Sequence, residues 1–479
     1  MPSQSISNSQ RNMIVAVMIV SAFVAILNQT LLNTALPQIM KGLNISENTS
    51  QWLVTGFMLV NGVMIPLTAF LMDKIKTRPL YLIAMGVFLI GSIVAALAPN
   101  FGVLMLARVI QAMGAGIIMP LMQFTLFMLF PKSKRGFAMG LAGLVIQFAP
   151  AIGPTLSGLV IDATSWRMPF IIVVGVALLG FIFGAIFIRS YNETKDTKLD
   201  KRSVVYSTLG FGILLYAFSS AGNLGFSSPI VIIALIVSIF IIGAFIRRQL
   251  NIDNPLLNLV VFKSRVFTLT TASSMIVMMG MVGPALLIPL YVQNALGLSA
   301  FLSGLVIMPG AIINGIMSIF TGKFYDKYGA RPLILTGFTL FLILTILLCF
   351  LTVETSYMYL IIVYALRMFS VSLLMMPLNT AGINSLRNKD ISHGTAISNF
   401  GRVTAGSLGT ALMVTFMTVG AKIFAPKPTA HESKDLLQRQ AIAGGVDFAF
   451  AIVSVLVVIG LIMAWFVRED RTNVNTREI

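Results

Sequence analysis

Hydrophobic residues occur along this chain in repeated runs of about 20 residues, separated by short polar stretches. A helix rises 1.5 Å per residue, so about 20 apolar residues cross the hydrocarbon core of a bilayer. The runs lack the alternation of apolar and polar residues that marks the strands of a membrane β-barrel. The pattern predicts an all-α membrane protein with fourteen transmembrane helices, at residues 13–36, 51–72, 80–98, 102–128, 137–161, 168–188, 204–221, 229–246, 267–291, 301–321, 333–352, 358–384, 394–424 and 445–467.

The composition supports this reading. The 479-residue chain is 57% hydrophobic and only 10% charged, so it cannot cover itself with a polar surface. Soluble domains carry about 25% charged residues. The composition therefore excludes a secreted, nuclear or cytosolic protein and predicts a multi-pass protein of the cell (cytoplasmic) membrane. The single cysteine, Cys349, allows neither a disulfide framework nor a cysteine zinc site, and we expect no metal and no cofactor.

The charge is strongly basic, with 33 Lys and Arg against 16 Asp and Glu and a net charge of +17. In a soluble protein such an excess indicates nucleic-acid binding, whereas in a membrane protein basic residues collect in cytoplasmic loops. With both termini placed in the cytoplasm, 24 of the 33 basic residues lie inside, six lie outside, and three lie within spans: Arg108, Arg367 and Arg402. We therefore predict two cytoplasmic termini, an even number of spans and no nucleic-acid partner.

Two predicted cytoplasmic loops are related in sequence. Residues 73–80 and 326–333 agree at five of eight positions without a gap and lie 253 residues apart. The first loop joins spans two and three and the second joins spans ten and eleven, so the repeat unit is eight spans. We predict a six-helix bundle at residues 1–188, a linker with two additional transmembrane helices at 189–264, and a second six-helix bundle at 265–479. Paired bundles are typical of transporters that work by alternating access.

Each related loop contains an aspartate and an arginine, Asp73 and Arg78 in the first copy and Asp326 and Arg331 in the second. A carboxylate accepts hydrogen bonds from N–H groups at a helix terminus, and an arginine pairs with such a carboxylate. The duplication favours a gating role for these residues over the alternative, an ordinary solvated turn.

Polar residues also occur inside the predicted spans, where a polar side chain needs a partner or a water-filled cavity. Arg108 lies about six residues into the fourth span, and snorkelling to the outer interface is the alternative to a functional role. Amide side chains are the candidate lining of a substrate cavity, with helix–helix contacts as the alternative: Asn28, Gln29, Asn33, Asn61, Gln111, Gln147 and Asn379.

The fifth span is rich in glycine and proline: Gly140, Pro150, Gly153, Pro154 and Gly158. Proline within a helix bends it. Ala149, Gly153 and Ser157 follow at intervals of four, which places them on one helical face and permits close packing against another helix.

These motifs resemble the major facilitator superfamily, and within it the fourteen-span drug:proton antiporters that include the lincomycin-resistance exporters. The antiporter signature of that family is matched in the fifth span at Gly140, Gly153, Pro154 and Gly158. Its fourth-span pattern is matched at Arg108, Gln111 and Gly114. In the first span, Asn28 replaces the acidic residue of the family, and an amide cannot exchange a proton at working pH.

The resemblance implies a proton-coupled multidrug exporter that moves amphipathic antibiotics, such as lincosamides, and lipophilic cations by alternating access. Its expected partners are a small-molecule drug, protons and the lipid bilayer, and we expect a monomer. The alternative is a metabolite or nutrient transporter on the same fold. A membrane-embedded enzyme is disfavoured, because the longest loop of about 20 residues holds neither paired carboxylates nor a His/Glu cluster.

Since the amide of Asn28 cannot carry the proton, a carboxylate elsewhere in the chain is needed. Of the 16 acidic residues, 14 fall in predicted loops. Asp162 and Asp447 lie near the membrane, at the outer ends of their spans. We therefore expect one of these two carboxylates to carry the proton, coupled to Arg108 or Arg402.

Overall fold

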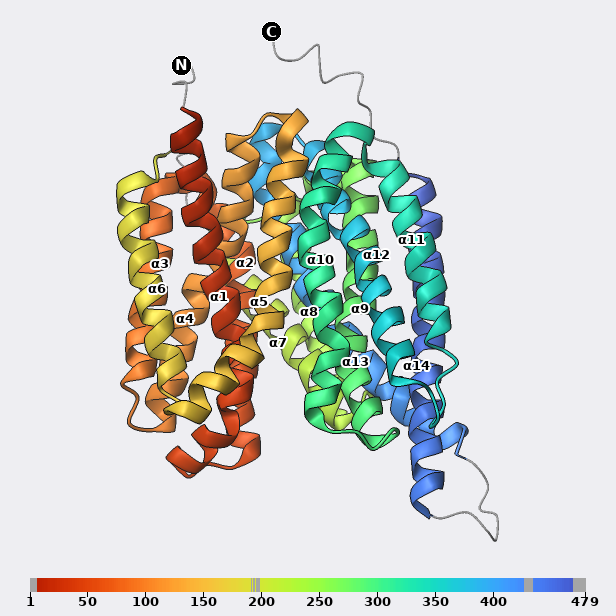
Figure 1. The fold of residues 1–479 in the computed structure, drawn as a ribbon. Coiled ribbons are helices and arrows are strands. Elements are labelled where there is room, and N and C mark those ends of the chain that lie inside the picture. The colour runs from red at the N-terminus through yellow and green to blue at the C-terminus, as the bar shows by residue number, and fades with distance from the viewer. Residues whose placement is uncertain (1–6, 191, 193, 195–198, 426–433, 468–479) are drawn as a thin grey trace. The chain divides into compact units, whose positions relative to one another are not determined.

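The computed structural model describes residues 7–190, 192, 194, 199–425 and 434–467; for a few helical residues, among them Asn33, Pro154, Gly158 and Asp162, it describes the backbone only. These residues form fourteen α-helices and three short 3-10 helices, with no strand in the described ranges (Figure 1). The α-helices are α1 (Asn8–Leu43), α2 (Glu47–Lys74), α3 (Thr77–Ala96), α4 (Phe101–Leu129), α5 (Arg135–Ala163), α6 (Met168–Phe187), α7 (Lys201–Leu224), α8 (Pro229–Asn251), α9 (Arg265–Asn294), α10 (Ala300–Tyr328), α11 (Ala330–Leu347), α12 (Tyr357–Asn384), α13 (Ile391–Ile423) and α14 (Lys434–Trp465). The 3-10 helices are η1 (Lys132–Lys134), η2 (Leu259–Lys263) and η3 (Asn388–Asp390).

Each predicted span coincides with one α-helix, so the all-helical class is confirmed. Thirteen of the helices, all except α5, are long and apolar enough within the described residues to cross a membrane. The count of fourteen spans therefore stays a prediction. Several helices begin at a serine or asparagine whose side chain accepts an N–H group of the first turn, which satisfies a donor that has no partner within the helix: Ser7, Ser46, Asn100, Ser264 and Ser299.

The largest differences from the predicted spans lie at polar helix ends. The last helix, α14, begins at Lys434 rather than at 445, and α10 continues to Tyr328 rather than ending at 321. Both extensions contain lysine, and that of α14 also contains arginine and glutamine, residues that favour helix as readily as apolar residues do. The hydropathy of a segment sets where a helix can be buried in lipid, and it does not set where the helix ends.

The helices divide into two compact units. Unit 1 comprises Met1–Tyr216, Val237–Val260 and Arg387–Phe400, and unit 2 comprises Ala217–Ile236, Val261–Leu386 and Gly401–Ile479. The division passes through α7, α8 and α13, so the bundle boundaries expected at 188 and 265 stay predictions.

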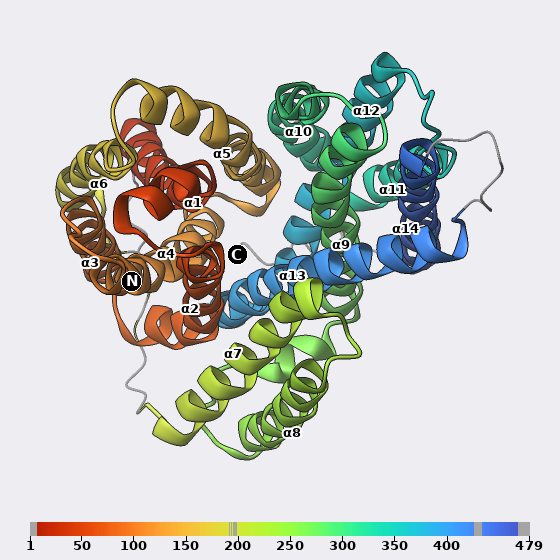
Figure 2. The same cartoon turned by 90° about the horizontal axis from the view of Figure 1, so that it is seen from below.

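The same packing pattern occurs in both units. In unit 1, α4 packs against α1, α2 and α3, and α6 packs against α1 and α3 (Figure 2). In unit 2, α12 packs against α9, α10 and α11, and α14 packs against α9 and α11. Each of these five contacts in unit 1 has its counterpart eight helices later, which is the offset that the two related loops predicted.

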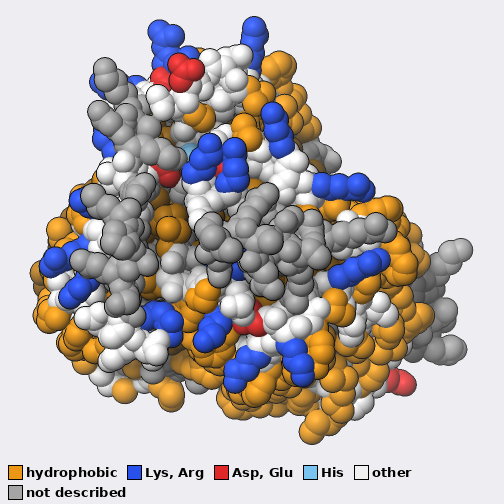
Figure 3. All heavy atoms as spheres, turned by 90° about the horizontal axis from the view of Figure 1, so that it is seen from above, with side chains coloured by type: hydrophobic (Ala, Val, Ile, Leu, Met, Phe, Trp, Pro, Cys, Tyr) orange, Lys and Arg blue, Asp and Glu red, His pale blue; other side chains and the backbone are white. Residues whose placement is uncertain are grey.

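Hydrophobic side chains cover much of the surface. On α8, Phe240 and Ile239 are 75% and 64% exposed. Lys and Arg side chains gather on the face drawn in Figure 3, while hydrophobic side chains form most of its border. Large exposed apolar areas are rare on soluble monomers and are expected where lipid covers the surface. The chain is a multi-pass membrane protein.

A charged contact joins the beginning of α7 to the end of α8 within unit 1. Asp200 accepts hydrogen bonds from Arg248 Nε at 2.5 Å and Nη2 at 2.9 Å, and it also accepts the backbone N–H of Ser203 at 3.1 Å. The hydrogen bonds from Arg248 hold the pKa of the Asp200 carboxyl well below its usual range, and the hydrogen bonds from Ser203 and the positive charge of Arg248 act in the same direction. The carboxylate therefore caps α7 and fixes it to α8.

Candidate functional site

Arg108, on α4, is completely buried within unit 1. Its Nε donates to the carbonyl oxygen of Leu53 on α2 at 3.2 Å, and its Nη1 donates to Gln111 Oε1 at 3.0 Å. The guanidinium carbon lies 4.1 Å from the centre of the Phe57 ring, which gives a cation–π contact. This geometry excludes snorkelling, because the side chain is held among helices of the bundle.

Gln111, one turn after Arg108, extends this contact to two further helices. Its Nε2 donates to Ser92 Oγ on α3 at 3.0 Å and to Asn28 Oδ1 on α1 at 3.5 Å. The described hydrogen bonds thus link Asn28 to Arg108 through Gln111. Two buried groups of this network, Asn28 Nδ2 and Arg108 Nη2, have no hydrogen-bond partner among the described residues. The network holds α1 to α4 together with neutral partners around one cation.

Unit 2 contains a related buried arginine, Arg367 on α12. Its Nε donates to Thr345 Oγ1 on α11 at 3.1 Å, its Nη2 donates to the carbonyl oxygen of Gly280 on α9, and its guanidinium carbon lies 4.4 Å from the centre of the Phe341 ring. Thr345 follows Ser92 by 253 residues, the separation of the two related loops. The internal repeat therefore extends into the buried polar networks.

Arg402 and Asn379 come together in unit 2, as donor and acceptor. Arg402 Nη1 on α13 donates to Asn379 Oδ1 on α12 at 3.1 Å, and both side chains are buried. Arg402, a candidate for proton coupling, and Asn379, a candidate for the cavity lining, are thus hydrogen-bonded to each other.

The two candidate proton carriers differ in what the structure describes. Asp447, on α14, is partly buried, and its Oδ1 accepts the backbone N–H of Leu351 at 2.9 Å, in the segment after α11. The side chain of Asp162, near the end of α5, lies outside the described residues.

The first related loop begins in a polar cluster of unit 1. Asp73 Oδ1, near the end of α2, accepts a hydrogen bond from Ser392 Oγ at 2.6 Å, and its Oδ2 lies 3.3 Å from His393 Nε2. Both partners lie in the first turn of α13. His393 Nδ1 accepts the backbone N–H of Asn258 at 3.2 Å, and Asn258 Nδ2 donates to Asp390 Oδ1 at 3.2 Å. The aspartate thus faces the beginning of a helix that follows it by more than 300 residues.

The turn between α2 and α3 is held by Asn192, from the segment after α6. Its Nδ2 donates to the carbonyl oxygens of Met72 at 2.7 Å and Ile75 at 3.1 Å. Its Oδ1 accepts from the backbone N–H and the hydroxyl of Thr77, both at 2.8 Å. Arg78 Nη2 donates to the carbonyl oxygen of Ala185 at 2.7 Å, near the end of α6. The turn is therefore built on α6 and on the residues after it.

The second related loop differs in detail from the first. Asp326 is half-buried near the end of α10, and the guanidinium of Arg331 lies 5.9 Å from the ring of Trp465 on α14. Gly329 has φ of 89°, a left-handed conformation that glycine adopts without strain. A gating role for the two loops stays a prediction.

The small-residue stripe of α5 lies against α1. Ser157 Oγ donates to the carbonyl oxygen of Leu31 at 2.8 Å, and Ala149 is fully buried. A Cβ on Gly153 would lie 2.1 Å from Thr30 Oγ1 and 2.9 Å from Thr30 Cβ, so a larger residue there would force Thr30 to shift. Gly140 is buried and Pro150 is exposed, while Pro154 and Gly158 lie outside the described side chains. Gly153 and Ser157 therefore hold α5 close to α1.

The other candidate cavity residues are less informative. Gln29, Asn61 and Gln147 are partly buried, and the side chain of Asn33 lies outside the described residues. The backbone of Asn61 approaches α4 at Gly116, where an added Cβ would lie 3.0 Å from its carbonyl oxygen. Of the seven candidates, the structure places Asn28 and Gln111 on the Arg108 network and Asn379 on Arg402.

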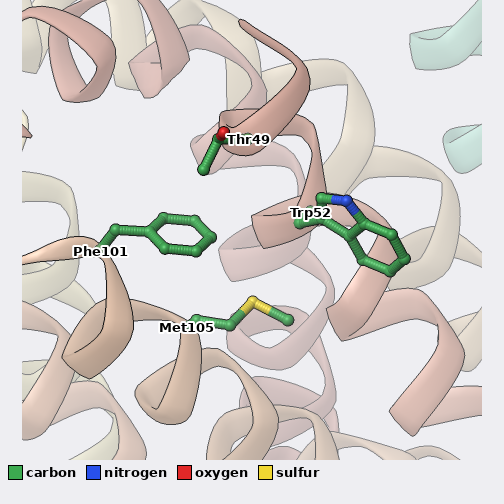
Figure 4. Close-up of a pocket in the computed structure, with 4 residues that line it drawn as sticks. All are labelled: Thr49, Trp52, Phe101 and Met105. Carbon is green, nitrogen blue, oxygen red and sulfur yellow. The ribbon is translucent and has the colours of Figure 1, made fainter. Parts of the chain in front are cut away.

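A pocket of about 350 Å³ lies in unit 1 between the first turns of α2 and α4. It is lined by Thr49, Trp52, Phe101 and Met105, and Figure 4 shows the Phe101 ring and the Met105 side chain extending toward the side of α2. The pocket surface is mainly aromatic and thioether, with one hydroxyl. Among the described residues, no three His, Cys, Asp or Glu side chains come together as metal ligands.

Two buried contacts were not predicted from the sequence. Gln123 Oε1 on α4 accepts from Asn399 Nδ2 on α13 at 2.9 Å within unit 1, and His393 joins Asp73. The amides were visible as polar residues in apolar runs, which is the only signal that points to them. Their pairing joins positions 276 residues apart and has no signature in one sequence.

Comparison with known proteins gives consistent matches over nearly the whole chain. Residues 18–410 match the model of the Major Facilitator Superfamily. The chain is 43% identical over 461 residues to the uncharacterized MFS-type transporter YcnB of Bacillus subtilis (strain 168), covering 96% of each chain. It is 38% identical over 458 residues to the lincomycin resistance protein LmrB of Listeria innocua serovar 6a, covering 96% of this chain and 97% of that protein. Among solved structures, the proton:xylose symporter XylE matches with a TM-score of 0.64 and 15% identity, over 96% of both chains, a likeness of fold alone.

Proposed function

Because the chain belongs to the Major Facilitator Superfamily, we propose that it is a proton-coupled exporter of amphipathic antibiotics such as lincosamides, and of lipophilic cations, that works by alternating access. The chain is a membrane transporter and not an enzyme. The observation that carries the proposal is the similarity to a lincomycin resistance protein at 38% identity over 96% of this chain. A relationship of that extent covers both units and every motif discussed above.

The close contact of α5 with α1 supports export as the direction. Gly153, one of the residues that match the signature of drug:proton antiporters, lies in this contact, beside Ser157. We further propose fourteen spans in two six-helix bundles with an inserted pair, both termini in the cytoplasm, a cell-membrane location and a monomer. The basic face in Figure 3 supports the orientation, because basic residues collect on the cytoplasmic side. We also propose that the loop residues Asp73, Arg78, Asp326 and Arg331 act in gating.

Asp447 is the carboxylate that we propose as the proton carrier. It is partly buried on a candidate span, and its described hydrogen bond comes from a backbone N–H rather than from a basic side chain. Such a group takes up a proton without breaking an ion pair. Asp162 is the second candidate, on its position near the end of α5.

The test uses purified protein in liposomes with an imposed pH gradient and a fluorescent pH reporter. Lincomycin, and separately a lipophilic cation dye, are added to the liposomes. We expect each compound to cause proton movement that empty liposomes do not show. Proton movement with sugars or amino acids, and with no drug of a broad panel, would contradict drug export and favour the nutrient-transporter alternative.

A matched pair of variants tests the proton carrier. Asp447→Asn removes the partly buried carboxylate, while Glu354→Gln removes an exposed carboxylate in the same region, three residues after Leu351. We expect Asp447→Asn to reduce drug-dependent proton flux at least about tenfold and Glu354→Gln to retain it. Unchanged flux in Asp447→Asn contradicts Asp447 as the carrier and leaves Asp162 as the candidate. Unchanged flux in the double variant with Asp162→Asn refutes both assignments.

A further inference from the structure

The charge of Arg108 is not balanced by a carboxylate in the described structure. Its side chain is 0% exposed, and its described partners are the Leu53 carbonyl, the Gln111 amide and the Phe57 ring, all neutral. Its Nη2 has no hydrogen-bond partner among the described residues. A buried cation without a counter-ion costs several kcal/mol, so this group strongly favours an incoming anion.

Asn28 is the residue that leaves this charge uncompensated. The amide reaches the network through Gln111, at 3.5 Å, and its own Nδ2 also lacks a partner among the described residues. An aspartate of the same size would bring a negative charge to this position. Among the described residues, the network therefore offers two donors without a partner and no anion.

The aromatic pocket lies one helical turn from this cation. Met105, which lines the pocket, precedes Arg108 by three residues on α4, or about 4.5 Å along the axis. On α2, Trp52 of the pocket is adjacent to Leu53, whose carbonyl accepts from Arg108. The Met105 methyl group lies over Gly56, where an added Cβ would come within 2.3 Å of it. Methionine rotates readily, so its side chain can move aside and connect the pocket to the arginine.

We propose that Arg108 binds the carboxylate of an aromatic organic acid whose ring occupies the pocket lined by Trp52, Phe101 and Met105. The inference adds aromatic organic acids to the lincosamides and lipophilic cations of the proposed function, on which it rests. The pocket volume of about 350 Å³ suits a ligand of one or two rings. The ligand supplies the negative charge that Asn28 does not.

The test measures equilibrium binding to the full-length protein in detergent, so it does not depend on transport. The probes are benzoate and benzamide, which have nearly the same shape and differ in charge at pH 7. Ligand that binds the folded protein raises its unfolding temperature, and a titration gives the Kd. We expect benzoate to bind the wild-type protein at least about tenfold more tightly than benzamide.

Two variants identify the groups responsible. Asn28→Asp supplies an internal carboxylate of the same size, and we expect it to abolish the preference for benzoate. Trp52→Ala alters the pocket without altering the charge, and we expect it to weaken both probes equally. Arg367→Gln, which removes the related arginine of unit 2, is the control and should keep the preference for benzoate.

Three results would overturn the proposal. The first is equal binding of the two probes to the wild-type protein. The second is a benzoate preference that persists in Asn28→Asp. The third is stabilisation by chloride as strong as that by benzoate, which would assign the cation to a small inorganic anion. A benzoate preference without drug-dependent proton flux in liposomes would refute the export function and leave the binding site in place.

Discussion

Gly114 allows α3 and α4 to pack closely, and replacing it with alanine tests the packing argument directly. A Cβ at this position would lie 2.5 Å from the carbonyl oxygen of Ala84, 2.7 Å from Phe88 Cβ and 2.8 Å from the backbone nitrogen of Phe88. Backbone atoms cannot rotate away as a flexible side chain can, so α3 has to shift as a whole. The shift would also strain the bond of 3.0 Å between Gln111 and Ser92.

The magnitude follows from comparison with a glycine that has free space. Gly175, on α6, has no atom within 4 Å of an added Cβ. Both substitutions gain the helix propensity of alanine, up to about 1 kcal/mol. Only Gly114→Ala adds an overpacking cost, about 1–3 kcal/mol for one added carbon in a packed interior. We expect Gly114→Ala to be less stable than Gly175→Ala by about 1–3 kcal/mol, a factor of about 5 to 150 in the unfolding equilibrium.

Titration of the purified variants with SDS in mixed micelles, followed by circular dichroism, measures this difference. The order of midpoints should be Gly175→Ala at or above wild type and Gly114→Ala below it. Equal midpoints for the two variants would mean that α3 moves away without cost, and the reasoning from close contact would be refuted.

Two further predictions concern charged contacts of unit 1. Asp73→Ala removes the acceptor of Ser392 and the neighbour of His393. We expect this variant to reduce lincomycin-dependent proton flux at least about tenfold. The control, Lys74→Ala, changes the next residue on α2 and should retain most of the flux. Equal flux in the two variants would contradict gating by Asp73. Arg248→Gln removes the partner of Asp200. Because the folded-state pKa of Asp200 is lowered, its contribution to stability is present above the unfolded pKa of about 3.9 and is lost as the pH falls below it. The variant should therefore have a lower unfolding temperature than the wild type at pH 7. The difference in unfolding temperature should shrink below about pH 4. A difference that does not change with pH would contradict a stabilising ion pair.

The positions of the helices were predictable because hydropathy reports where a segment is buried in lipid. The polar first turns of α14, from Lys434, carry no such signal, and helix propensity alone extends them. The internal repeat was also predictable, because identical loop residues mark equivalent positions. The repeat reappears in the packing around α4 and α12. It also reappears in the equivalent positions of Ser92, which contacts Gln111, and Thr345, which contacts Arg367.

The partners of the candidate site residues were only partly predictable. The sequence indicates that Arg108 needs a partner, since a cation inside a span is expensive. It does not indicate that Gln111 stands between Arg108 and Asn28, because side-chain direction depends on how three helices pack. Asp73 was expected at a helix terminus, yet the helix itself, α13, could not be identified from spacing along the chain.

Asn192 uses its entire hydrogen-bonding capacity on the turn between α2 and α3. Its two amide hydrogens are donated to the carbonyls of Met72 and Ile75, and its oxygen accepts hydrogen bonds from the backbone N–H and the hydroxyl of Thr77. An aspartate there would set a negative oxygen against two carbonyl oxygens, so spontaneous deamidation of this one residue would damage a loop 115 residues away. The conformation of the loop consequently depends on the segment after α6. A chimera that takes α1 to α5 from this protein and the following segment from a relative needs an asparagine at the equivalent position to keep the turn intact.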